Sequence, residues 1–277
     1  MGIAYAEVIG DPVGHSQSPL IHQTWLSMLG IPGDYRASRV APSQLATFLA
    51  ARRDDPDWRG CNVTIPHKQS VLDLVDGVEP GAREIGAINC ISRSDDGLVG
   101  RNSDIDGVAA ALAGVEIPGA KAVLIGAGGA ARAAVRHVLD CGAESISILV
   151  RDPVKAEGLR RWGAAGRIEI WPLAHADDAM AGSTLIINAS PMGMAGMPAM
   201  PAGLLASVTA HASGAALFDM VYQPLETEFL AAARRGSGTA VDGLTMLIGQ
   251  ARAAFHLFFG QPAPADGEQI LRDLMAT

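Results

Sequence analysis

The feature that most constrains the fold is a glycine-rich turn at residues 126–131. It follows an apolar strand predicted at residues 121–125, opens a predicted helix, and reads Gly126-Ala127-Gly128-Gly129-Ala130-Ala131, which matches G-x-G-x-x-G/A. Glycine is needed here because the turn is tight and because a pyrophosphate must approach the backbone closely. Free N–H groups at the helix N-terminus then attract the phosphates. The context predicts a dinucleotide site, and the alternative is a glycine-rich turn without a ligand.

Strand and helix patterns alternate on both sides of this turn, which is typical of parallel sheets covered on both faces. Before the turn, we predict strands at residues 4–9, 34–39 and 60–65, a hairpin of residues 88–93 and 98–102, and helices at residues 18–29, 42–52 and 66–76. After it, we predict strands at residues 145–150, 167–171, 184–188 and 215–220, and helices at residues 129–140, 243–259 and 266–275.

This order of elements predicts an α/β protein of two domains with a cleft between them. The first is an α/β domain of residues 1–104, completed by the C-terminal helices of residues 243–277. The second is a doubly wound, Rossmann-type domain of residues 105–242, which contains the glycine-rich turn.

Composition and charge exclude several classes of protein. Hydrophobic residues make up 49% of the chain and charged residues 18%, which is not the composition of a disordered protein. The net charge is −8 and no basic stripe is present, so we expect no nucleic-acid ligand. The three cysteines, Cys61, Cys90 and Cys141, fit neither a zinc motif nor a disulfide framework, and we predict no metal site.

One long uncharged stretch raises the question of a membrane span. Residues 182–218 contain no Asp, Glu, Lys or Arg, but they contain Asn188 and several prolines, which break a helix and leave polar groups that lipid cannot satisfy. We therefore predict a buried strand followed by a loop. The N-terminus lacks the basic and apolar regions of a signal peptide, so we expect a cytoplasmic protein that does not bind membranes.

The tip of the strand at residues 145–150 is where the cofactor's ribose is read in a doubly wound domain. Arg151 follows this strand, and an Arg at this position can stack on adenine and pair with a 2′-phosphate. Asp152 comes next, and a carboxylate could instead accept a free ribose hydroxyl. Asp152-Pro153 also suits a helix N-cap, with Asp152 paired to Lys155. In the remaining alternative, Arg151 is an ordinary solvated charge.

Four segments of the N-terminal domain carry more polar residues at loop positions than packing needs. In the first, Ser16 and Ser18 lie at a strand-to-helix turn and could bind a carboxylate, or Ser18 could only cap the helix. In the second, Lys68 follows a strand that Pro66 ends. There it opposes a helix dipole, which hints at function, although a solvent-facing Lys is the alternative.

The third and fourth segments contain an amide and a carboxylate. Asn89 follows an apolar run and could donate to a ligand hydroxyl, or it could satisfy buried backbone groups. Asp104 could pair with Lys68 and favour its protonated form, or Ser103 or Asp104 could simply cap the next helix.

These four segments, in this order and ahead of the glycine-rich turn, resemble the shikimate dehydrogenase family. The resemblance covers essentially the whole chain. It continues downstream in three further motifs, which are Asn188-Ala189-Ser190-Pro191-Met192-Gly193-Met194, Asp219-Met220-Val221-Tyr222-Gln223-Pro224, and Asp242-Gly243-Leu244-Thr245-Met246-Leu247 with Gln250. Each motif alone is weak evidence, but together and in register they are specific.

The resemblance implies a role for each matching residue. Lys68 and Asp104 match the catalytic pair. The substrate-binding positions are matched by Ser16, Ser18, Thr64, Asn89, Tyr222 and Gln250, and the cofactor positions by Gly126, Ala127, Gly128, Gly129, Ala130, Ala131, Arg151, Gly243 and Met246. The family usually reads Asn-Thr where this chain has Asn89-Cys90, and Asn-Arg-Thr where it has Val150-Arg151-Asp152.

The resemblance implies a reversible, NADPH-dependent reduction of 3-dehydroshikimate to shikimate. We expect the protein to be a monomer or a homodimer. NAD is the alternative cofactor because of Asp152. Lys68 would donate a proton to the developing alkoxide or stabilise its charge, and His67 is a rival donor whose side chain should diverge from Lys68. A quinate or aminoshikimate dehydrogenase on the same scaffold is a second hypothesis. A non-catalytic dinucleotide-binding sensor is a third, but a sensor would not need Lys68 and Asp104 together.

Overall fold

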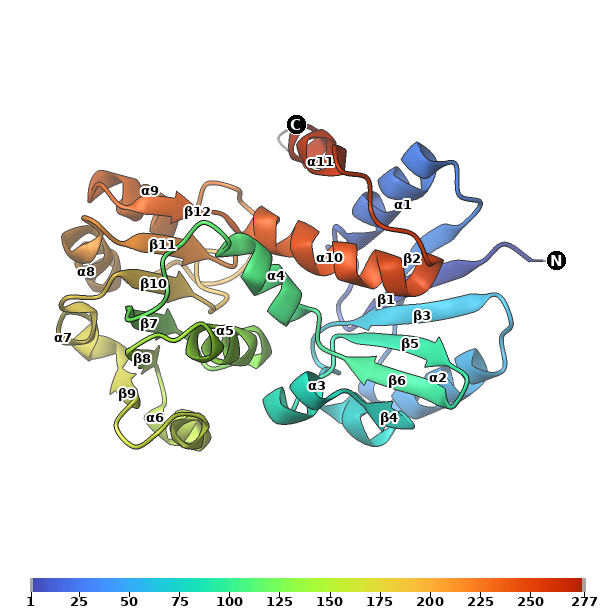
Figure 1. The fold of residues 1–277 in the computed structure, drawn as a ribbon, viewed down its shortest axis with the longest axis horizontal. Coiled ribbons are helices and arrows are strands. Elements are labelled where there is room, and N and C mark those ends of the chain that lie inside the picture. The colour runs from blue at the N-terminus through green and yellow to red at the C-terminus, as the bar shows by residue number, and fades with distance from the viewer. Residues whose placement is uncertain (1, 276–277) are drawn as a thin grey trace. The chain divides into compact units, whose positions relative to one another are not determined.

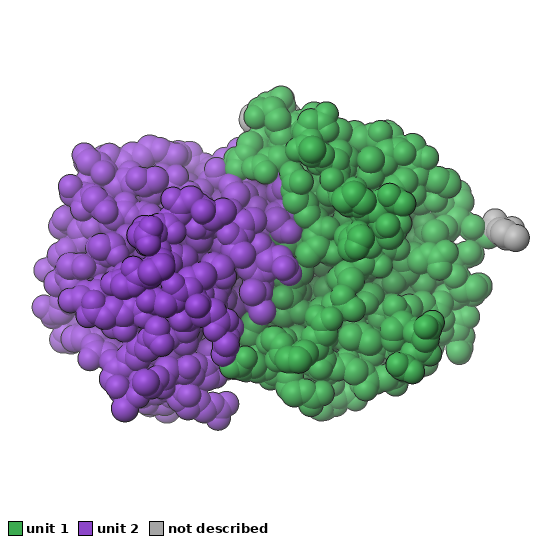
Figure 2. Space-filling model, in the orientation of Figure 1, with its two compact units in different colours: residues 1–104, 250–277 green, residues 105–249 purple. Residues whose placement is uncertain are grey.

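The computed structural model describes residues 2–275, and Figure 1 shows the course of the chain. The chain divides into two compact units (Figure 2). One unit comprises residues 1–104 and 250–277, and the other comprises residues 105–249. The long helix α10 (Gly243–Phe259) contributes residues to both units. No helix within residues 2–275 is both long and apolar enough to cross a membrane.

The first unit, residues 1–104 with 250–277, contains a mixed sheet of six strands in the order β2-β1-β3-β5-β6-β4. The three strands β1, β2 and β3 run parallel, whereas β5 is antiparallel to both β3 and β6. The strands are β1 (Tyr5–Gly10), β2 (Asp34–Arg39), β3 (Trp58–Val63), β4 (Gly77–Val78), β5 (Cys90–Ser94) and β6 (Gly97–Arg101). The helices are α1 (Ser18–Leu29), α2 (Leu45–Arg53), α3 (Pro80–Ile85) and α11 (Gly267–Met275).

The second unit, residues 105–249, contains a six-stranded sheet in the order β12-β11-β10-β7-β8-β9, and every pairing in it is parallel. The strands are β7 (Lys121–Ile125), β8 (Ser145–Val150), β9 (Ile168–Pro172), β10 (Leu185–Asn188), β11 (Ala216–Asp219) and β12 (Thr239–Val241). The strand order reverses between β7 and β10, which is the arrangement of a doubly wound, Rossmann-type sheet. The predicted fold class is therefore confirmed.

Helices cover both faces of this second sheet (Figure 1). One hydrophobic core contains buried residues of α4 (Asp104–Ala111) and α5 (Gly129–Asp140), and the other contains buried residues of α7 (Ala176–Met180), α8 (Ala202–His211) and α9 (Glu228–Arg235). A central strand buried on both faces must be apolar throughout, which explains why β7 reads Lys-Ala-Val-Leu-Ile with only its first residue exposed.

The sequence-based predictions hold for ten of the twelve strands within residues 2–275 and miss the short strands β4 and β12. Among the helices, the differences at two segments have a clear physical reason. The predicted helix at residues 66–76 is wrong: this segment forms turns and the short 3-10 helix η2 (Ser70–Asp73). The Lys68 carbonyl accepts a hydrogen bond from the Ile88 N–H at 2.7 Å, which replaces a helical bond with a tertiary one. The segment at residues 182–218 contains α8 in addition to the predicted strand and loop. Its exposed side has Ala, Ser and Thr in place of charges, which hid the helix.

A buried histidine lies in the aromatic core of the first unit. His22 on α1 is fully buried, and its ring stacks on that of Tyr35 with 4.0 Å between the ring centroids and 3° between the planes. Trp25 and Phe255 also contact it, each with a centroid separation of 5.8 Å. Burial lowers the pKa of His22 to about 3, because the cationic form would be desolvated. His22 is therefore neutral in the folded protein at neutral pH.

We predict that His22 weakens the fold in acid. The folded state binds this proton only near pH 3, whereas the unfolded chain binds it near pH 6.5, so between these values the unfolded state holds more protons. The free energy of unfolding should fall by roughly 1.4 kcal/mol for each pH unit as the pH decreases through this window. Urea unfolding of the wild type and His22→Phe at several pH values measures this slope. The substitution should flatten the slope, and His175→Gln, which removes an exposed histidine, should not. Equal slopes in all three proteins would contradict the prediction.

Candidate active site

Four loop segments of the first unit meet at one edge of its sheet. The segments that follow β1 and β3 leave the carboxyl ends of two parallel neighbours, so they start at the same edge. Because β5 runs antiparallel to β3 and β6, the residue before Cys90 and the residues after Arg101 also lie at that edge. The topology therefore brings together Ser16 and Ser18, Thr64 and Lys68, Asn89, and Asp104.

The central interaction at this edge is an ion pair between Lys68 and Asp104. Lys68 Nζ donates to Asp104 Oδ2 at 2.6 Å, which confirms the predicted pairing. The Lys68 side chain is 22% exposed and that of Asp104 is 8% exposed, so the amine faces an accessible space while the carboxylate is nearly buried. Asp104 is the first residue of α4, where the helix dipole stabilises its negative charge. Lys68 lies in a turn before η2, so the predicted opposition between Lys68 and a helix dipole is wrong.

Asn89 fixes the carboxylate of this pair. Its Nδ2 donates to Asp104 Oδ1 at 2.8 Å, and its Oδ1 accepts from the Ser103 N–H at 2.7 Å. The Asp104 N–H donates in turn to Asn102 Oδ1 at 3.1 Å, so the side chain of Asn102 accepts a backbone hydrogen bond at the start of α4. Asn89 thus satisfies a buried backbone N–H, which was one of the two roles that the sequence allowed for it. It also orients the carboxylate of Asp104 toward the amine of Lys68.

The remaining substrate-side candidates surround this pair. Gln250 Oε1 lies 3.4 Å from Ser103 Oγ, which places the side chain of Gln250 beside the Asn89 network. Ser16 Oγ accepts the Ser18 N–H at 3.3 Å. Ser18 begins α1 and is buried but does not cap it, because the N-cap position belongs to Gln17. The capping alternative for Ser18 is therefore wrong. Thr64 directly follows β3 and is half-buried.

His67 does not share the site of Lys68. Its ring is buried, and Nε2 lies 2.7 Å from the Val40 carbonyl oxygen. Because a carbonyl only accepts hydrogen bonds, Nε2 carries the proton and is committed to the protein interior. The predicted divergence of the two side chains is confirmed.

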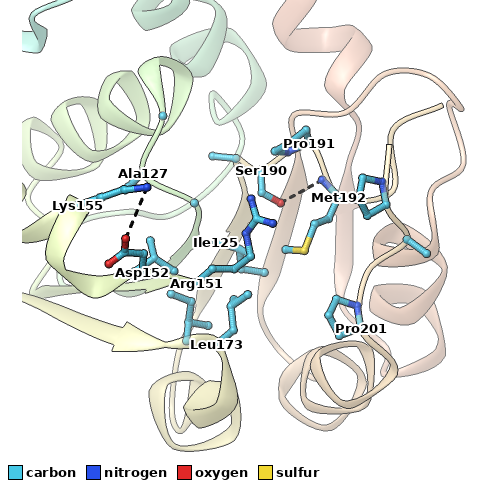
Figure 3. A pocket seen from close by; sticks show the side chains of 17 residues that line it. Ile125, Ala127, Arg151, Asp152, Lys155, Leu173, Ser190, Pro191, Met192 and Pro201 are labelled. Carbon is cyan, nitrogen blue, oxygen red and sulfur yellow. Dashed lines mark hydrogen bonds and ion pairs between the residues drawn. The ribbon is translucent and has the colours of Figure 1, made fainter. Parts of the chain in front are cut away.

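The second unit has a pocket of about 760 Å³ at the carboxyl ends of β7, β8 and β10 (Figure 3). Its wall is formed by Ile125, Gly126, Ala127, Gly128, Leu149, Val150, Arg151, Asp152, Lys155, Leu173, Ala189, Ser190, Pro191, Met192, Pro198, Ala199 and Pro201. The glycine-rich turn runs along this wall, and Gly128 is the N-cap of the twelve-residue helix α5. Gly126 has a φ of 112°, and a Cβ there would lie 3.0 Å from the Ala189 carbonyl oxygen, so only glycine fits without strain. These features fit a dinucleotide whose phosphates face a helix N-terminus.

The charges at the tip of β8 are arranged as the sequence predicted. Asp152 caps α6 (Pro153–Ala156) by accepting from the Val154 N–H at 3.2 Å, and it pairs with Lys155 Nζ at 3.6 Å. Figure 3 shows the Arg151 guanidinium apart from this pair. Arg151 therefore presents its charge to the pocket while Lys155 offsets that of Asp152.

Ser190 is a pocket residue to which sequence reasoning assigned no role. It lines the pocket directly after β10, and its hydroxyl donates to Asn188 Oδ1 at 2.7 Å. Ser190 could have been identified from the sequence as a polar residue that directly follows a predicted strand, next to the point where the strand order reverses.

Six predicted residues of the second unit lie outside this pocket wall. Gly129, Ala130 and Ala131 form the first turn of α5, where Ala131 is fully buried. Tyr222 follows β11 and is half-buried, and burial raises the pKa of its hydroxyl. Gly243 begins α10, and Met246 is buried in the core that α4 and α5 share.

Comparisons with known proteins show which family this chain resembles. The family model described as shikimate dehydrogenase substrate binding domain matches residues 8–91, and that of the shikimate 5′-dehydrogenase C-terminal domain matches residues 243–267. A shikimate dehydrogenase (NADP(+)) of Sphingopyxis alaskensis is 45% identical over 98% of this chain and 96% of its own.

Solved structures show the same likeness over the full length. A Listeria monocytogenes shikimate 5-dehydrogenase in complex with shikimate and NAD has a TM-score of 0.87 and 27% identity, covering 98% of this chain and 96% of its own. A Thermus thermophilus enzyme in complex with NADP(H) and shikimate has a TM-score of 0.81 and 32% identity, covering 98% and 99%. The resemblance seen in the sequence is confirmed, and the chain belongs to the shikimate dehydrogenase family.

Proposed function

We propose that the chain catalyses the reversible, NADPH-dependent reduction of 3-dehydroshikimate to shikimate. The observation that carries this proposal is the ion pair of Lys68 and Asp104, held at 2.6 Å beside an accessible space in a chain that is 45% identical to a shikimate dehydrogenase (NADP(+)). A non-catalytic sensor would have no use for such a pair. We assign substrate binding to residues 1–104 with the C-terminal helices from residue 243, and dinucleotide binding to residues 105–242.

Reduction of a ketone requires a hydride and a proton. The bound nicotinamide supplies the hydride. Lys68 donates a proton to the developing alkoxide, or stabilises its charge, through an ammonium that already has one partner in Asp104. Asp104 keeps the amine in place, and Asn89 keeps Asp104 in place through the hydrogen bond to Oδ1. In the direction of shikimate oxidation, Lys68 takes the proton back.

The other polar groups at this edge would bind the ring substrate. Ser16 and Ser18 supply hydroxyls for the carboxylate, since each lies at the start of α1, where N–H groups favour an anion. Thr64 and Gln250 supply hydroxyl and amide groups for the ring hydroxyls. The family resemblance assigns the same role to Tyr222 of the second unit. The second amide hydrogen of Asn89 would make the same kind of contact.

The cofactor would lie against the glycine-rich turn, with its phosphates at the N-terminus of α5. Gly126, Ala127 and Gly128 form this turn, and Gly129, Ala130 and Ala131 are the first residues of α5. Arg151 would pair with the 2′-phosphate of NADP. Gly243 and Met246 are assigned to the nicotinamide end by the family resemblance.

Steady-state assays of shikimate and quinate, each with NADP and with NAD, test the proposed function. We expect the highest kcat/KM for shikimate with NADP. A higher value for quinate would favour the quinate dehydrogenase hypothesis. If the folded protein turns over neither acid but binds the cofactor, the sensor hypothesis is favoured instead.

We predict that Lys68→Ala lowers kcat by at least about 100-fold while the KM for shikimate stays within about tenfold, as expected when a proton donor or charge stabiliser is removed. Lys121→Ala, which removes an exposed lysine of the second unit, is the control and should behave as wild type. Thermal unfolding checks that both variants fold. Near-normal turnover of Lys68→Ala would refute the catalytic role.

We predict that Arg151→Ala removes most of the preference for NADP over NAD and leaves turnover with NAD nearly unchanged. A charge-assisted contact between Arg and phosphate contributes roughly 1.5–3 kcal/mol, or about tenfold to 100-fold in affinity. Asp152→Ala is the matched comparison and should change the ratio only slightly, because Lys155 already offsets that carboxylate. If the wild type turns over faster with NAD at equal cofactor concentration, Asp152 reads the ribose and this assignment is wrong.

A further inference from the structure

The proposed mechanism leaves unused a buried carboxylate in the second unit. Asp219 is the last residue of β11, and none of its surface is exposed. Its Oδ1 accepts from Asn188 Nδ2 at 2.9 Å and from the Val221 N–H at 3.0 Å, and its Oδ2 accepts from Thr227 Oγ1 at 2.6 Å. Burial raises the pKa of Asp219 to about 6, and these three hydrogen bonds oppose that rise. Burying a carboxylate is costly, and hydrogen bonds from neutral donors offset part of that cost.

One of these contacts leads to the wall of the nucleotide pocket. Asn188 ends β10, and its Oδ1 accepts from both the N–H and the hydroxyl of Ser190, at 3.2 Å and 2.7 Å. Ser190 Oγ accepts in turn from the Met192 N–H at 3.3 Å. The amide of Asn188 is therefore clamped between Asp219 and the segment of residues 189–192, which lines the pocket.

The other contact on Oδ1 leads to the segment that carries Tyr222. The Val221 N–H is held by Asp219, so the backbone leaves β11 in a fixed direction just before Tyr222. The first residue of α10 packs directly on this segment: a Cβ on Gly243 would lie 2.5 Å from the Val221 carbonyl oxygen. The chain that follows the pocket loop also contacts the segment of Tyr222, because the Ala195 N–H donates to the Gln223 carbonyl at 2.9 Å.

We propose that Asp219 is a positioning residue for the cofactor site. One oxygen of its carboxylate, Oδ1, accepts hydrogen bonds both from Asn188, whose amide holds the pocket loop, and from the backbone N–H of Val221. The loop of residues 189–192 and the segment of residues 220–223 are thus held as one body. The inference rests on the proposed function, since it takes the pocket as the dinucleotide site. Its competitor is a purely structural role, in which Asp219 serves only to anchor Thr227 and with it the start of α9.

Because the two oxygens of Asp219 have different partners, substitutions of those partners distinguish the positioning role from the structural role. Asp219→Ala removes every contact, and Asn188→Ala removes only the link to the pocket loop. Thr227→Val is the matched control, because it removes the hydrogen bond on Oδ2 together with the side-chain cap on the Leu230 N–H, and it leaves Oδ1 untouched. Asp219→Asn keeps an acceptor oxygen for Asn188 and Val221, and is the conservative rescue. NADPH affinity is measured by fluorescence titration, and thermal unfolding and steady-state kinetics accompany it.

We expect Asp219→Ala and Asn188→Ala each to raise the Kd for NADPH by at least about tenfold, with kcat at saturating NADPH within about threefold of wild type, since loosened support for a binding site costs affinity while Lys68 and Asp104 are untouched. Thr227→Val should unfold at a lower temperature and bind NADPH as the wild type does. Asp219→Asn should recover most of the affinity that Asp219→Ala loses.

Two results would overturn the inference. One is an NADPH Kd that is unchanged in Asn188→Ala, which remains informative even if Asp219→Ala does not fold. The other is a loss of affinity in Thr227→Val equal to that in Asp219→Ala, which would assign Asp219 a structural role alone. Failure of the proposed function is distinct from both, because it would appear as a wild-type protein that oxidises no shikimate.

Discussion

Parallel pairing between neighbouring strands is the constraint on which both candidate sites depend. Parallel strands end at the same edge of a sheet, so residues far apart in the sequence are brought together when each follows a strand. In the first unit, β1 and β3 deliver Ser16 and Lys68 to one edge. In the second, β7, β8 and β10 deliver Gly126, Arg151 and Ser190 to another.

Ion-pair geometry alone would not have identified the catalytic candidates. Glu7 in the middle of β1 is fully buried, pairs with Arg52 at 2.7 Å, and accepts a hydrogen bond from Ser38. This pair is at least as well formed as that of Lys68 and Asp104. Its role is different because Glu7 lies within a strand, where its carboxylate ties β1 to β2 and α2, whereas Lys68 lies beyond a strand end and remains partly accessible. Position relative to the sheet edge therefore distinguishes this structural ion pair from the proposed catalytic one.

The sequence was sufficient for most of the strands, the Rossmann-type order and the pairing of Lys68 with Asp104, because hydrophobic periodicity and motif order carry that information. It missed the two- and three-residue strands β4 and β12, which are too short to show a period. It was insufficient where a tertiary contact overrides a local preference. The Lys68 carbonyl bonds to Ile88 rather than within a helix, and no local pattern reveals this. The partners of Asn89 depend on the register of β5 and β6, which places Ser103 within reach. The uncharged helix α8 lacks the polar face by which an amphipathic helix is recognised.

The hairpin of β5 and β6 has a consequence for attaching probes to this protein. Asn89 and Asn102 flank its open end at the candidate active site, while its turn, with Asp95 and Asp96 exposed, lies at the other end of strands five residues long. At roughly 3.3 Å per residue, the turn is about 16 Å from the active-site end. A fluorophore or a short inserted peptide at the turn would therefore share a rigid ribbon with the carboxylate of Asp104 without entering its surroundings. The hairpin thus offers a point from which distances to the candidate catalytic residues could be measured by spectroscopy.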